Sequence, residues 1–75
     1  MPHDRSMLED LIARAEKFVA EGADRLAAQR ARVAGMKRIG GGAEQSTRLL
    51  RIMEDTQALQ IDHLRTLKQE LQTAR

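Results

Sequence analysis

The stretch KRIGGGAE, residues 37–44, interrupts a sequence that otherwise favours helix. Each glycine inside a helix costs roughly 1 kcal/mol relative to alanine, so three in succession predict a break between two helices. The flanking segments, about residues 6–38 and 43–74, contain no proline and are rich in Ala, Leu, Arg, Glu and Gln. β-Branched and aromatic residues are scarce, which disfavours strands. We therefore expect two helices over these segments, joined by a loop at residues 39–42.

Apolar residues in both segments recur at alternating spacings of three and four, which is typical of helices that pack along one seam. The first seam runs from Leu8 to Met36 and the second from Leu50 to Ala74. Two seams joined by a tight loop predict an all-α antiparallel helical hairpin, a single domain over residues 1–75. With the turn centred on Gly41, residues whose numbers sum to about 82 lie opposite each other, which places Gly22 against Gln60.

Local signals mark both ends of the first helix. Ser6 and Glu9 have the spacing of a capping box, in which each side chain binds the other residue's backbone amide. Lys37 and Arg38 lie in the expected last turn, with Gly40 just beyond it. We therefore expect the helix to begin with Ser6 as its cap and to end before the glycines.

The composition excludes several classes of protein. The 75 residues include no Cys, which excludes a disulfide framework and a thiolate metal site. Thirteen basic and eleven acidic residues give a net charge of only +2, without a basic tract. No apolar run is long enough for a membrane span, and residues 1–6 lack the hydrophobic core of a secretory signal. We expect a cytoplasmic protein without membrane contact.

Nothing in the sequence has the spacing of a catalytic, metal or cofactor site. The two histidines, His3 and His63, are sixty positions apart. The triple glycine follows no strand and precedes no Gly-Lys-Ser/Thr, so it does not have the pattern of a phosphate-binding loop. We expect no enzymatic activity, no cofactor and no bound metal.

A single hairpin cannot enclose a core, because it has only one helix–helix contact. Leu11, Phe18, Ile52 and Leu59 widen the apolar stripes and have little to touch inside one hairpin. The simplest solution is a homodimer that forms a four-helix bundle, and a different protein partner is the alternative. The residues predicted for this interface follow the seams: Leu8, Ile12, Ala15, Val19, Gly22, Leu26, Val33, Met53, Gln60, Leu64, Leu67 and Leu71.

The middle of the hairpin is polar. Gly22 lies there with Thr56, Gln57, Gln60 and His63. Buried polar side chains lower stability but can fix register and oligomeric state. The other interpretation places the glutamines and His63 at the edge of the stripe, in water.

A nucleic-acid interface is the second functional hypothesis. Arg14, Phe18, Arg25 and Arg32 line one flank of the first helix, where arginines can contact phosphates and the phenylalanine can stack on a base. Glu21 lies on the same flank, and the small net charge disfavours strong phosphate binding. We therefore rank RNA below a protein partner.

Several stretches carry a resemblance to short uncharacterised proteins of alpha-proteobacteria. They are IARAEKFVAEG at residues 12–22, Gln29-Arg30, Leu49-Leu50, MEDTQALQ at 53–60 and Asp62-His63-Leu64. The resemblance implies a helical hairpin of bacterial origin and brings no activity with it. In architecture alone, the expected hairpin is also similar to Rop-type RNA-binding hairpins, which dimerise into four-helix bundles.

Overall fold

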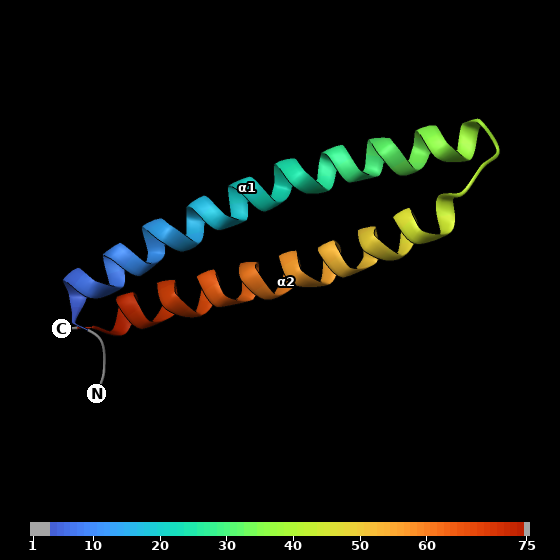
Figure 1. The fold of residues 1–75 in the computed structure, drawn as a ribbon. Coiled ribbons are helices and arrows are strands. Elements are labelled where there is room, and N and C mark those ends of the chain that lie inside the picture. Colours follow the sequence, from blue (N-terminus) through green and yellow to red (C-terminus); the bar gives the residue numbers. More distant parts are fainter. Residues whose placement is uncertain (1–3, 75) are drawn as a thin grey trace.

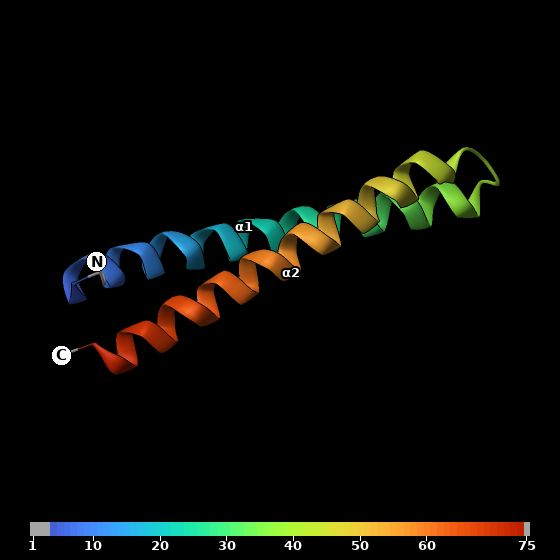
Figure 2. The same cartoon turned by 90° about the horizontal axis from the view of Figure 1, so that it is seen from below.

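The computed structural model describes residues 4–74, which form two long antiparallel helices joined by a short turn (Figure 1). Helix α1 spans Arg5–Arg38 and helix α2 spans Ala43–Thr73. The helices lie side by side in a rod of 57 × 16 × 14 Å, and two views at right angles show that they cross at a shallow angle (Figures 1 and 2). The predicted all-α helical hairpin is confirmed, and α1 begins one residue earlier, and α2 ends one residue earlier, than we expect from the sequence.

Asp4 caps α1, so the prediction of a Ser6 cap is wrong. The Asp4 backbone is extended, and its Oδ1 accepts a hydrogen bond from the Met7 amide at 2.7 Å. Ser6 lies inside the first turn, and the Glu9 carboxylate is 3.6 Å from the Arg5 guanidinium. Because a carboxylate two residues earlier can reach the same free amides, the helix begins before the expected capping box.

Backbone hydrogen bonds end α1 at the glycines. The Gly40 amide donates to the Lys37 carbonyl, and the Gly41 amide donates to the Met36 carbonyl, each at 3.2 Å. Gly40 has a φ of +77°, in the left-handed region that closes such a Schellman motif. A side chain at that position would be strained, which explains why a glycine directs the chain into the turn.

The largest apolar cluster lies far from the turn. Leu8, Ile12 and Ala15 of α1 are buried against Leu67 of α2. Closer to the turn, Leu26 and Val33 are also buried. Leu67 is the only residue of α2 that is buried, whereas α1 buries seven of its residues. Helix α2 therefore leaves most of its apolar stripe partly open to solvent.

Two glutamines connect the helices by side chain to backbone hydrogen bonds. The Gln57 Nε2 donates to the Val19 carbonyl at 2.8 Å, and the Gln29 Nε2 donates to the Ser46 carbonyl at 2.9 Å. The Gln57 amide lies where a Cβ of Gly22 would be. Gly22 therefore faces Gln57 and not Gln60, because the Gln57 side chain crosses this position to reach Val19.

Candidate docking face

One edge of the hairpin carries the ion pairs that join the helices. The Glu16 carboxylate is 3.6 Å from the Lys68 ammonium, and the Arg30 guanidinium is 3.3 Å from the Glu54 carboxylate. The two residues of α1 are fourteen positions apart, as are the two of α2, and Ile61 lies midway between Glu54 and Lys68. We call this side the ion-pair edge.

The opposite side carries apolar residues that the hairpin does not cover. Phe18, Ile52 and Leu59 keep 58%, 62% and 69% of their surface exposed. Each of these residues is two positions along its helix from a residue of the ion-pair edge. Two positions correspond to a rotation of about 200° around the helix axis, so the apolar residues lie on the opposite side. We call this side the open face, which comprises Leu11, Phe18, Arg25 and Arg32 of α1 with Leu49, Ile52, Thr56, Leu59 and His63 of α2.

A groove of about 170 Å³ runs between the helices on the open face. Phe18 and Arg25 form its α1 wall, and Ile52, Thr56 and Gln60 form its α2 wall. Gln60 is half-buried there, whereas Thr56 and His63 are exposed. The polar middle predicted from the sequence is therefore divided: Gln57 is bonded between the helices, Gln60 lies in the groove, and His63 faces water.

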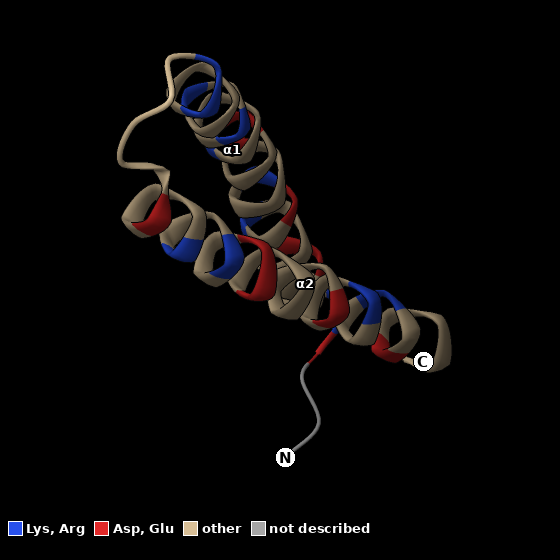
Figure 3. Cartoon of the chain, turned by 90° about the vertical axis from the view of Figure 1, so that its right-hand side faces the viewer, with Lys and Arg blue, Asp and Glu red and all other residues tan. Residues whose placement is uncertain are grey.

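The charges of the hairpin are unevenly distributed along its length (Figure 3). Residues 28–54, the part nearest the turn, contain six basic and two acidic side chains, a net charge of +4. Residues 4–27 and 55–74, the part farther from the turn, contain six basic and nine acidic side chains, a net charge of −3. The rod thus has a basic end at the turn and an acidic end opposite. The two charges nearly cancel, so the net charge of the chain does not show this separation.

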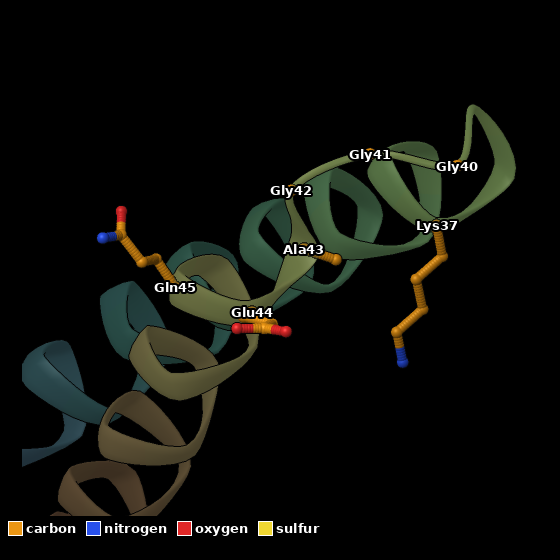
Figure 4. Close-up of a pocket in the computed structure, with 7 residues that line it drawn as sticks. All are labelled: Lys37, Gly40, Gly41, Gly42, Ala43, Glu44 and Gln45. Carbon is orange, nitrogen blue, oxygen red and sulfur yellow. The ribbon is translucent and has the colours of Figure 1, made fainter.

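A hollow of about 500 Å³ lies beside the turn. Its lining is mainly the backbone of Gly40–Gly42, flanked by Lys37 and Glu44, whereas Gln45 points away (Figure 4). Lys37 and Glu44 carry opposite charges, so the hollow does not concentrate charge of one sign. It has the chemistry of an exposed turn, in agreement with the interpretation of the glycines as a hairpin loop.

The twelve residues predicted for the interface all lie along the seam between α1 and α2. Seven are buried: Leu8, Ile12, Ala15, Gly22, Leu26, Val33 and Leu67. Five are half-buried: Val19, Met53, Gln60, Leu64 and Leu71. The hairpin itself uses most of their surface, so a partner would meet them only where they reach the open face.

The four residues considered for nucleic-acid contact are all exposed. Phe18, Arg25 and Arg32 lie on the open face, and Arg14 lies beside it, seven positions from Glu21. Their spacing therefore brings three arginines and one aromatic ring to one side of α1, as the sequence predicts. Because the open face also carries the exposed side chains of Phe18, Ile52 and Leu59, a protein partner and a nucleic acid would compete for the same surface.

Among the residues that the structure describes, no group of three His, Cys, Asp or Glu side chains is arranged to hold a metal ion. Neither α1 nor α2, over residues 4–74, is long and apolar enough to cross a membrane. His3 lies outside the described residues.

Comparison with known proteins gives no match to a family model, a curated protein or a solved structure. The resemblances to short alpha-proteobacterial proteins and to Rop-type hairpins therefore stay predictions.

Proposed function

We propose that the protein is a non-enzymatic interaction module that forms a homodimeric four-helix bundle through its open face. The observation that carries this proposal is the exposure of Phe18, Ile52 and Leu59 on one face, where Phe18 and Ile52 also line the groove. Three large apolar side chains on one face are unfavourable in water, and burying the exposed part of each against a partner contributes about 1–2 kcal/mol.

The asymmetry between the two sides of the hairpin supports this choice of face. On the ion-pair edge, Glu16 and Lys68 bridge the helices, so this side already has partners for its charges. The open face offers large exposed apolar side chains on both helices, whereas the hollow between the helices on the ion-pair edge is flanked by the Arg30–Glu54 pair. A second hairpin placed on the open face would supply the enclosed core that one hairpin lacks.

Two substitutions on α2 test this proposal, because Leu59 and Ile61 are both exposed but lie on opposite sides. Leu59→Glu buries a charge in the dimer and should give a monomer in light scattering, with lower helicity or a lower melting temperature. Ile61→Glu is the matched control and should stay dimeric. A dimer that survives Leu59→Glu but is lost with Ile61→Glu would contradict the proposed face.

Binding of RNA is the second candidate, supported by the exposure of Phe18 and of the three arginines near it. In the proposed dimer Phe18 is covered, so dimerisation and base stacking exclude each other. Binding of a structured RNA by monomeric protein, weakening steeply as salt increases, would favour this candidate. A folded monomer that binds no RNA would instead favour a different protein as the partner.

A further inference from the structure

We infer that the second copy docks on the open face in the inverted orientation, with the two turns at opposite ends of the bundle. This inference rests on the proposed homodimer and adds its topology. It follows from two independent features of the hairpin, the distribution of charge along the rod and the positions of the exposed apolar residues on α2.

The charge distribution favours the inverted orientation. A dimer with both turns at the same end would place two regions of net charge +4 side by side, and two regions of −3 side by side. The inverted dimer instead places the basic end of each copy along the acidic end of the other. Like charges in proximity repel and complementary ones attract, so the surface is complementary to a reversed copy of itself.

The apolar residues of α2 favour the same orientation. Ile52 and Leu59 are seven positions apart on one side of α2, with Thr56 between them. An antiparallel pairing of the two α2 helices centred near Thr56 puts Ile52 of each copy against Leu59 of the other. It also gives a two-fold axis perpendicular to the rod, as a closed dimer requires.

The same centre brings opposite charges on the two α1 helices closer together. Gly22 of α1 is level with Gln57 of α2, so a centre near Thr56 is level with Ala23, one residue beyond Gly22. Reversal about that position brings Glu21 of one copy within about two helical turns of Arg32 of the other. In the same-end orientation, these two residues would be eleven positions apart along the rod.

Distances between spin labels test the orientation directly. The chain has no Cys, and a Cβ at Gly41 meets open space, so Gly41→Cys places one label in each turn. In the inverted dimer the two labels should be about 40 Å or more apart, given a rise of 1.5 Å per residue. In a same-end dimer they would be about 10–20 Å apart, because the two packed layers of helices lie 8–10 Å from each other and the labels add to this distance.

A label at the other end of the rod provides the matched control. Gln72→Cys is exposed near the end of α2, and mixing Gln72→Cys that carries an acceptor fluorophore with Gly41→Cys that carries a donor restricts energy transfer to dimers with one label at each position. This mixed pair should show the short distance if the copies are inverted, and the long one if they are not. Short distances between the turns in a sample of dimeric mass would overturn the orientation and leave the proposed homodimer intact, whereas a monomeric mass would overturn both.

Charge reversal provides a second readout. Glu21→Arg and Arg32→Glu should each weaken the dimer, and the double variant should recover most of the affinity because the attraction between the two positions is restored with opposite signs. Dissociation constants from dilution series measure both effects. Weakening without recovery in the double variant, while the single variants remain helical, would contradict the inverted pairing.

Discussion

At the scale of single residues, Gly22 and Gln57 form the most specific contact of the hairpin. A glycine in the middle of a helix costs roughly 1 kcal/mol relative to alanine. Here the missing side chain gives room to the Gln57 amide, which hydrogen-bonds to the Val19 carbonyl. The cost of the glycine is therefore offset by a contact between the helices.

This contact predicts that Gly22→Ala changes the stability of the wild-type protein and of a Gln57→Ala variant by different amounts. Gly22→Ala gains helix propensity but displaces the Gln57 amide, a loss of about 0.5–1.5 kcal/mol, so stability should change by less than about 0.5 kcal/mol. In a Gln57→Ala background nothing is displaced, and Gly22→Ala should stabilise by about 1 kcal/mol. Urea unfolding at one fixed protein concentration measures both effects. An equal gain in the two backgrounds would show that Gln57 does not lie over Gly22.

The sequence predicts a close approach at Gly22 but not the residue that approaches. Gln57 and Gln60 are about one helical turn apart, and the long flexible side chain of either glutamine can reach Gly22. Which of them bonds depends on a free acceptor, the Val19 carbonyl, and on the exact stagger of the helices. Neither property is encoded in a spacing of apolar residues.

At the scale of the helices, periodicity predicts much more than local end signals do. The seams extend over about four heptads, so many residues support the same helix and a single exception does not matter. The start of α1 depends on a choice between two nearby caps, Asp4 and Ser6. Both have side chains suited to capping, and the capping-box pattern favours the wrong one.

The cap of α1 gives a prediction with an internal control. Asp4→Ala removes the acceptor of the Met7 amide and should destabilise the protein by about 1 kcal/mol. Ser6→Ala removes no cap and replaces a weaker helix former, so it should be neutral or stabilise by a few tenths of a kcal/mol. Thermal unfolding followed by circular dichroism compares them. A larger loss of stability for Ser6→Ala than for Asp4→Ala would show that Ser6 caps the helix, as the capping-box pattern predicts.

At the scale of the whole molecule, the sequence predicts the hairpin and most of the residues that widen its stripes. Phe18, Ile52 and Leu59 are expected to have little to touch, and they are exposed. Leu11 is expected to be like them but is half-buried, because it packs against the apolar cluster far from the turn. The side that the ion pairs occupy is not predictable, because Glu16–Lys68 and Arg30–Glu54 join residues far apart in the chain. The segregation of charge becomes visible only when the chain is folded back on itself.

The mass of the unmodified protein in solution tests the central claim, that one hairpin leaves too much apolar surface exposed to remain alone. Multi-angle light scattering over a dilution series, with circular dichroism on the same samples, measures association and folding together. We predict a helical species with twice the 8.4 kDa mass of one chain, which dissociates and loses helicity on dilution. A fully helical species of 8.4 kDa at every concentration would contradict the claim.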